Sequence, residues 1–176
     1  MDITELILIQ HHEQRRSFAL LDDIARDDAE RLAAVWSRLE VLLEVHAAAE
    51  EKFFYPQLLA VAGGRRADSS MTDSGGVTDE VKDAIKDHND IREGIRKVRK
   101  HQPGTDGWWA AVTETREANS DHMAEEERED LRDFRRASDL HQRHEIALQF
   151  ITFESQHAAG ITPRDKDPEG YVQQPG

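Results

Sequence analysis

Two histidine–glutamate pairs are the residues of this chain best suited to binding a metal. His46 is followed four residues later by Glu50. The same spacing separates His122 from Glu126. On a helix, side chains four residues apart share one face, with Cβ atoms ~6 Å apart, so each pair could hold one side of a metal centre. Neutral imidazoles bind iron, zinc or copper, and a carboxylate can bridge two cations and offset their charge.

Single histidines precede both pairs at nearly equal distances. His11 and His12 lie 35 and 34 residues before His46. His88 lies 34 residues before His122. The chain therefore has the pattern of a duplicated unit, in which a helix with one histidine precedes a helix with His-x-x-x-Glu. Packed together, four such helices would bring four imidazoles and two carboxylates to one point of the core. Buried groups of these types are costly unless they are paired or bind a cation, which favours a metal site.

Helical apolar periodicity places these residues on four long segments. We expect helices over residues 3–26, 28–61, 79–101 and 107–136, with Thr78 as the N-cap of the third. No segment shows sustained alternation of apolar and polar residues, so no sheet is predicted. Long helices joined by short or flexible connections favour antiparallel neighbours. The sequence therefore predicts an all-α fold, an up-down antiparallel four-helix bundle.

The remaining segments are expected to be accessory to the bundle. Residues 62–76, AGGRRADSSMTDSGG, have the composition of a loop. A shorter C-terminal helix is expected over residues 138–158. The chain after Gly160 holds three of the five prolines and is expected to form an extended tail. The predicted organisation is a bundle domain over 1–136, an additional helix over 137–160 and a tail over 161–176.

The composition argues against several classes of protein. A net charge of −13 disfavours nucleic acid and anionic membranes as partners, because both need a basic surface. The chain has no cysteine, which excludes disulfides, thiolate ligands and iron–sulfur clusters. No apolar run approaches the ~18 residues of a membrane span. The start, MDITELILIQHHEQRR, has no basic region before its short apolar run and does not resemble a secretory signal. We therefore expect a cytoplasmic protein.

These motifs resemble those of the hemerythrin-like (HHE cation-binding) family, in its stand-alone bacterial form. The resemblance covers about residues 3–135 and includes the stretch HAAAEEKFFYP at 46–56. It implies two iron ions, bridged by oxygen and carboxylates, in the core of the bundle. The implied ligands are Glu50 and Glu126 as bridging carboxylates, His46, His88 and His122 as terminal imidazoles, and one of His11 and His12.

The first-helix ligand depends on which face of that helix is buried. Ile7 lies four residues before His11, and Phe18 and Leu21 lie seven and ten residues after it. This shared apolar face favours His11 as the ligand. The equal spacing of 34 residues instead favours His12, so the alternative stays open.

The chain departs from the oxygen-carrying members of the family at Arg92. Those members have a second histidine there, four residues after the histidine of the third helix. The centre would be one imidazole short, and water, a carboxylate such as Glu127, or a phenolate could complete it. Phe54, four residues after Glu50, should face the site, whereas Tyr55 should point elsewhere on an ideal helix.

Acidic residues beside the predicted ligands are expected to be solvated. Glu13, Glu51 and Glu125 each lie next to a predicted ligand but are rotated off its helix face. His101 lies near a helix end, where a histidine can simply favour the helix dipole.

The leading functional hypothesis is an enzyme that consumes hydrogen peroxide in a catalase-like disproportionation. A centre short of protein ligands should exchange water and peroxide more readily than it holds oxygen reversibly, and the resemblance to stand-alone bacterial members implies such an activity. One alternative is a protein that binds or senses dioxygen or nitric oxide. Another is iron storage or detoxification, although a ferritin-like site would have Glu-x-x-His rather than His-x-x-x-Glu.

Overall fold

The computed structural model describes residues 1–65 and 74–175, and within them it contains helices and no strand. The elements are α1 (Ile3–Asp22), α2 (Ala29–Ala49), the π-helix η1 (Glu50–Phe54), α3 (Tyr55–Arg65), α4 (Ser74–Val98), α5 (Asp106–Arg128), α6 (Asp130–Ala137), α7 (Leu140–Gln156) and α8 (Pro168–Gln173). The π-helical turn η1 joins α2 directly to α3, and residues 157–167 form a long connection between α7 and α8.

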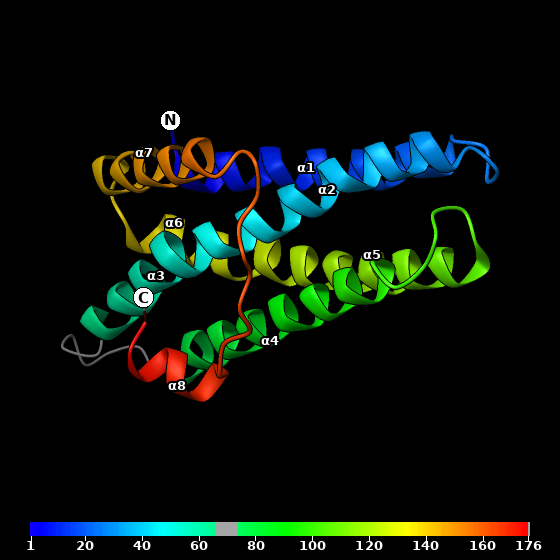
Figure 1. Cartoon of the computed structure of the whole chain (residues 1–176). Helices are drawn as coiled ribbons and strands as arrows, with labels where there is room; N and C mark the ends of the chain where they lie inside the picture. Colours follow the sequence, from blue (N-terminus) through cyan, green and yellow to red (C-terminus); the bar gives the residue numbers. More distant parts are fainter. Residues whose placement is uncertain (66–73, 176) are drawn as a thin grey trace.

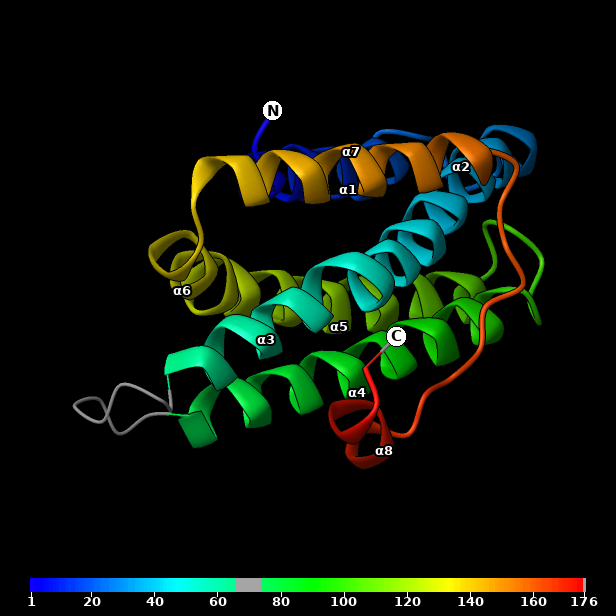
Figure 2. The same cartoon turned by 90° about the vertical axis from the view of Figure 1, so that its left-hand side faces the viewer.

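The helices form an up-down bundle with four long arms (Figure 1). The first arm is α1, the second is the continuous rod α2–η1–α3, the third is α4, and the fourth is α5 followed by α6. Helix α1 packs along α2, and α4 packs along α5, each pair running antiparallel. Helix α7 covers α1 and α2 on one side, and α8 lies against α4 on the other (Figure 2). The predicted all-α, up-down four-helix bundle with a shorter C-terminal helix is confirmed.

Side-chain caps define where several helices begin. The carboxylate of Asp2 accepts from the backbone N–H of Thr4 at the start of α1. Asp28, Thr105 and Asp139 act in the same way before α2, α5 and α7. Such caps satisfy N–H groups that have no partner inside the helix, and each contributes about 1 kcal/mol.

The apolar core is divided by a polar layer. One cluster of buried apolar side chains joins the N-terminal end of α1 to α3, α4, α6 and α7. The other joins the far end of α1 to α2, α4 and α5. The predicted histidines lie between the clusters, at the same level on each arm. Along the chain the order is Ile7, His11 and Phe18 on α1, Leu43, His46 and Ala49 on α2, and Ile85, His88 and Ile91 on α4.

Several predicted boundaries were wrong. The predicted loop at 62–76 is helical as far as Arg65, and α4 already begins at Ser74; residues 66–73 lie outside the described residues. Thr78 therefore lies inside α4 instead of capping it. The fourth predicted helix is interrupted at Glu129, whose ψ of −73° ends α5 before α6 begins. These errors share a cause, because helix ends and breaks depend on tertiary contacts as well as on local sequence.

The predicted extended tail holds a further short helix. In α8, the side chain of Asp167 accepts from the N–H of Gly170, and Pro168 occupies the first turn, where its missing N–H costs nothing. Tyr171 belongs to the core cluster that also contains side chains of α1, α3, α4, α6 and α7. The tail is therefore attached to the bundle through α8.

In the part of the chain that the structure describes, no helix has the length and apolar character needed to cross a membrane.

Candidate metal centre

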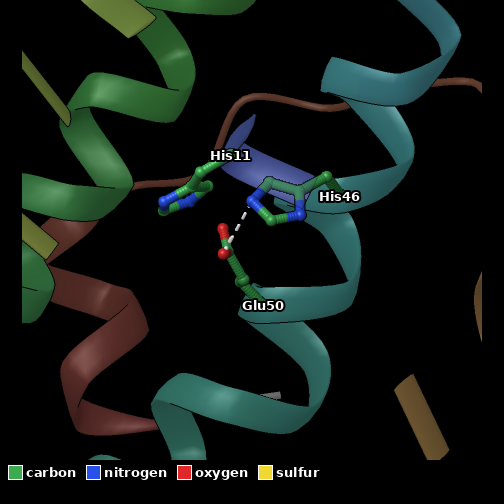
Figure 3. Close-up of side chains that lie close together, drawn as sticks. All are labelled: His11, His46 and Glu50. Carbon is green, nitrogen blue, oxygen red and sulfur yellow. Dashed lines mark ion pairs between the residues drawn. The ribbon is translucent and has the colours of Figure 1, made fainter. Parts of the chain in front are cut away.

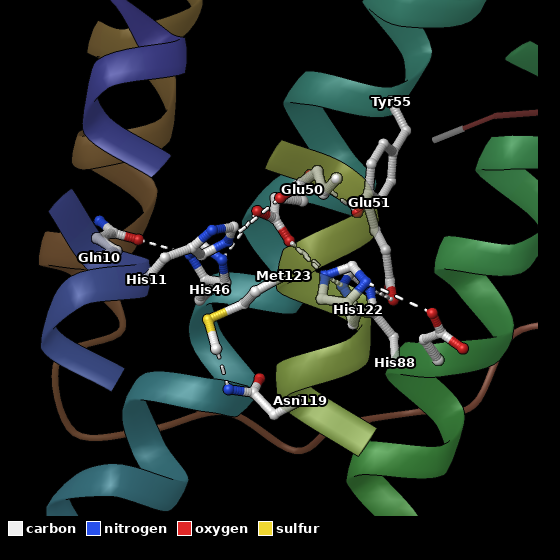
Figure 4. Close-up of polar contacts among 12 residues, drawn as sticks. Gln10, His11, His46, Glu50, Glu51, Tyr55, His88, Asn119, His122 and Met123 are labelled. Carbon is white, nitrogen blue, oxygen red and sulfur yellow. Dashed lines mark hydrogen bonds and ion pairs between the residues drawn. The ribbon is translucent and has the colours of Figure 1, made fainter. Parts of the chain in front are cut away.

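Four histidines, one from each arm, gather in the middle of the bundle (Figure 4). All four side chains are buried. The Nε2 atoms of His88 and His122 lie 3.1 Å apart. The rings of His11 and His46 have centroids 5.2 Å apart. His12 is exposed, so α1 turns His11 into the core and His12 toward solvent.

Glu50 lies beside His11 and His46 (Figure 3), and it also reaches His88. Its Oε1 is 2.8 Å from His46 Nε2, and its Oε2 is 3.2 Å from His88 Nε2. The ligand atoms of His11, His46 and Glu50 all lie within 4.8 Å of one another, and the same holds for a second group. That group consists of Glu50, His88 and His122. Glu50 thus belongs to both sets of donor atoms, with one oxygen turned toward each.

The second predicted bridging carboxylate, Glu126, lies beside His11. Its Oε2 is 3.2 Å from His11 Nε2, and its Oε1 accepts a hydrogen bond of 3.1 Å from the hydroxyl of Tyr55. Glu126 is buried, like the other five predicted ligands. The structure therefore brings all six side chains into one layer of the core.

Several inward-facing atoms of this layer have no hydrogen-bond partner among the described residues. They approach one another within ion-pair distance, but not with the directions that a hydrogen bond needs. Each buried polar atom left unsatisfied costs about 1–3 kcal/mol, so a group of them around one point fits a bound cation. These atoms are His11 Nε2, His46 Nε2, both carboxylate oxygens of Glu50, and Glu126 Oε2.

Residues 2–134 match the family model of the hemerythrin HHE cation-binding domain. The chain belongs to the hemerythrin HHE family. The matched residues end within α6, so α7 and α8 lie beyond them. No curated protein and no solved structure gives a significant match to the chain. The family's domain binds cations, and the histidine–glutamate layer contains groups that could hold a metal ion.

The Nδ1 atoms of the histidines, which point away from the centre, also have polar partners. These contacts repeat in the two halves of the hemerythrin domain. His88 Nδ1 lies 2.9 Å from Glu51 Oε1, and His11 Nδ1 lies 2.9 Å from Glu127 Oε1. Glu51 and Glu127 each follow a predicted bridging glutamate directly. Because a carboxylate oxygen accepts, each Nδ1 carries the proton and leaves the Nε2 lone pair free for a metal.

His46 follows the same rule. Its Nδ1 lies 2.6 Å from the amide oxygen of Gln10, whose NH₂ group donates to Glu154. His122 has a longer contact, with its Nδ1 3.8 Å from Asp87 Oδ2, beyond hydrogen-bond distance. Gln10 and Asp87 each directly precede one of the single histidines, so the two contacts occupy equivalent positions in the two halves of the domain.

Arg92 has a counterpart in this duplicated arrangement. Four residues after His11, Arg15 donates to Glu127 at 2.8 Å; four residues after His88, the buried Arg92 donates to Glu51 at 2.6 Å. Each arginine therefore donates to the glutamate that contacts a histidine Nδ1, Arg15 to Glu127 and Arg92 to Glu51. Glu127, considered from sequence as a substitute ligand, contacts the outer nitrogen of His11.

The prediction that Glu51 is solvated was wrong. Its side chain is buried and accepts from His88 and Arg92, with Lys166 Nζ a further 3.4 Å from its Oε2. Burial alone would raise the pKa of Glu51, but the hydrogen bonds and charges of these partners lower it. Glu125 is exposed, as expected. The repeated Glu-Glu pair at 50–51 and 126–127 was the sequence signal that could have identified Glu51.

The π-helical turn η1 reverses the expected roles of two aromatic residues. The N–H of Tyr55 bonds to the carbonyl of Glu50, five residues earlier instead of four. This extra residue in the turn brings Tyr55, fully buried, toward Glu126. Phe54 packs instead on the apolar ring of Phe134, with centroids 5.2 Å apart. The expectation that Phe54 faces the site and Tyr55 does not was therefore wrong, because it assumed an ideal α-helix. Such turns are frequent at functional sites.

Pro56 leaves one carbonyl of the π-turn without a backbone partner. In the i→i+5 pattern, the carbonyl of Glu51 would pair with the N–H of residue 56, but proline has none. The hydroxyl of Tyr171 donates to this carbonyl at 2.5 Å. A residue of α8 thus satisfies the backbone group that Pro56 leaves without a partner.

The electrostatics of the layer are those of imidazoles among carboxylates. Burial alone would lower the pKa of His11 and His88, but hydrogen bonds to neighbouring glutamates outweigh it and raise both to about 9. Burial alone would raise the pKa of Glu50, whereas His46, His122 and His88 lower it well below its usual range. A bound cation takes the place of such protons, so metal binding here is coupled to proton release.

Proposed function

We propose that this hemerythrin domain holds two iron ions and uses them to decompose hydrogen peroxide. The observation that supports two ions is the sharing of Glu50 between two separate groups of donor atoms. Imidazole and carboxylate ligands suit iron among the common metals. The proposed ligands are His11, His46, Glu50, His88, His122 and Glu126.

Iron bound at this site would supply redox chemistry to the small molecules that reach it. In the disproportionation, two electrons and two protons leave one H₂O₂, which becomes O₂. They reduce a second H₂O₂ to two molecules of water, so no further oxidant or reductant is needed.

The two sides of the layer differ in how open they are. On one side, α7 covers His46 with the buried ring of Phe150, at a centroid distance of 6.0 Å. On the other side, a pocket of about 40 Å³ is lined by His122 and Glu126. A volume of this size holds only a few water-sized molecules. Its other lining groups are mostly carboxylates, which favour a neutral polar molecule such as peroxide over an anion.

The environment of Arg92 also favours decomposition of peroxide over reversible binding of dioxygen. Its guanidinium is bound to Glu51 and Asn89 and provides no ligand atom where the oxygen carriers of the resembled family have an imidazole. A set with fewer imidazoles leaves a coordination position for exchangeable small molecules.

The test is oxygen release from peroxide by iron-loaded protein, measured with an oxygen electrode beside elemental analysis. We expect two iron atoms per chain and many turnovers, with one O₂ released for every two H₂O₂ consumed. The metal-free chain and His122→Ala, loaded in the same way, are the controls. Reversible uptake of dioxygen with negligible gas from peroxide would make this a carrier instead, and one metal equivalent per chain, or a preference for zinc, would refute the di-iron proposal.

A further inference from the structure

An acidic pocket leads from the surface to one side of the candidate metal centre. It lies between α4 on one side and α5 and α6 on the other, and His122 and Glu126 are among its lining residues. The break between α5 and α6 at Glu129 places two further acids on its wall. None of the described residues that line it is Lys or Arg. Its acidic lining consists of Glu80, Asp83, Asp87, Glu125, Glu129 and Asp130, besides Glu126.

Asp130 is the residue of this acidic pocket that points to a ligand. Its side chain is 97% buried, since the residue is only 3% exposed. Within the described part of the chain, its Oδ1 has no hydrogen-bond partner, and no basic side chain forms an ion pair with it. Its side chain shares a hydrogen bond with Glu80, so one proton lies between these two carboxyl groups, and Glu126 is a further acid acting on it. A buried acid among acids is costly unless a proton or a cation is present.

Two buried carboxylates outside this pocket have cationic partners. Glu51 accepts from Arg92 at 2.6 Å, and Glu44 accepts from Arg99 at 3.0 Å. The lack of a cationic partner at Asp130 is thus a property of this pocket and not of buried acids in general here.

We propose that the acidic pocket is the entry site for the metal, where Asp130 and Glu80 bind a divalent cation before it reaches Glu126 and His122. The proposal rests on the proposed metal centre and adds the route by which it is filled. The pocket, at about 40 Å³, has room for an ion with a few waters. Carboxylates of one sign in a narrow cleft concentrate cations and accelerate their association. On the opposite side, the ring of Phe150 packs against His46 at a centroid distance of 6.0 Å.

The test follows the rate at which the metal-free full chain takes up Co²⁺, using the visible absorption of the bound ion in a stopped-flow instrument. The variant Asp130→Asn with Glu80→Gln removes both carboxyl groups, and with them the negative charge of the hydrogen-bonded pair, without changing side-chain size. We expect loading at least ~10-fold slower, the effect of removing a negative charge a few ångström from a dication. The final stoichiometry should stay at the wild-type value, because the proposed ligands are intact.

The matched control is Asp27→Asn with Glu117→Gln, which removes two exposed charges elsewhere. It should load at the wild-type rate. Added salt should slow the wild type and the control but have little effect on the pocket variant. If the double pocket variant does not fold, Glu80→Gln alone carries the same test, with a smaller slowing expected.

The two proposals fail in different ways. Loading of the pocket variant as fast as the control would overturn the entry site while leaving the metal centre intact. Absence of two Co²⁺ per chain in the wild type at equilibrium would overturn the two-metal centre before any rate is compared.

Discussion

Replacing Glu51 by alanine should destabilise the hemerythrin domain strongly, although sequence alone placed this residue in solvent. The substitution leaves Arg92, only 2% exposed, without its anionic partner. Removing one partner of a buried ion pair costs about 3–5 kcal/mol. For a domain of this size, 1 kcal/mol changes the melting temperature by ~2–4 °C, so we expect a decrease of ~6–20 °C in the metal-free protein.

The same substitution removes the acceptor that orients His88. The loss of such an outer contact weakens metal binding by ~10–100-fold, or about 1.4–2.7 kcal/mol. Thermal unfolding followed by circular dichroism measures the first effect, and titration with Co²⁺ measures the second. Glu51→Gln keeps an oxygen acceptor, so its melting temperature and its affinity for Co²⁺ should both fall less than in Glu51→Ala. The comparison separates the role of the hydrogen bonds from that of the charge.

The control is Glu117→Ala, since Glu117 is an exposed glutamate of α5 outside the acidic pocket. Its melting temperature should stay within ~2 °C of the wild type, as for most surface substitutions. If Glu51→Ala melts and binds metal like Glu117→Ala, the buried network around Glu51 contributes nothing, and the expectation from sequence was right in energetic terms.

Three further substitutions test the site and its support. His46→Ala should lose metal and, under metal-replete conditions, melt at a lower temperature, because bound metal stabilises the folded state. The control His101→Ala should keep its metal and its melting temperature. Elemental analysis measures the metal content, and thermal unfolding measures the melting temperature. Tyr171→Phe removes the donor to the free carbonyl of the π-turn and should cost about 1–3 kcal/mol by urea unfolding, and an unchanged midpoint would mean that water replaces the hydroxyl. Tyr55→Phe removes the hydrogen bond to Glu126 and should lower metal affinity by ~10–100-fold in a Co²⁺ titration, whereas unaltered affinity would show that this contact does not orient the carboxylate.

The duplicated pattern could be read from sequence because its geometry is local. Residues four apart on a helix share a face whatever surrounds them, so the pairs His46–Glu50 and His122–Glu126 each had to act as one unit. Equal spacings between the two halves then placed His88 at the level of His122. The repeated Glu-Glu pairs also include Glu51 and Glu127, which contact His88 and His11. These contacts could not be recognised from sequence, because they depend on which helices face each other.

The choice between His11 and His12 shows where the local argument ends. The apolar residues Ile7 and Phe18 favoured one face of the first helix, while the spacing to His46 favoured the other. A difference of one residue rotates a side chain by about 100° around the helix, and only the packing of α1 against the bundle decided that His11 is buried and His12 exposed.

The sequence by itself thus determined the helical class, the two His-x-x-x-Glu units and the layer of the bundle that they occupy, since each follows from periodicity along one helix. Only the tertiary structure decided that Tyr55 rather than Phe54 points toward the site. That choice depends on the N–H of Tyr55, which bonds to the carbonyl of Glu50 instead of that of Glu51. The carbonyl of Glu51 then has no backbone partner, because Pro56 has no N–H. The group that satisfies it, Tyr171, lies 120 residues further along the chain, so no local pattern contains the reason.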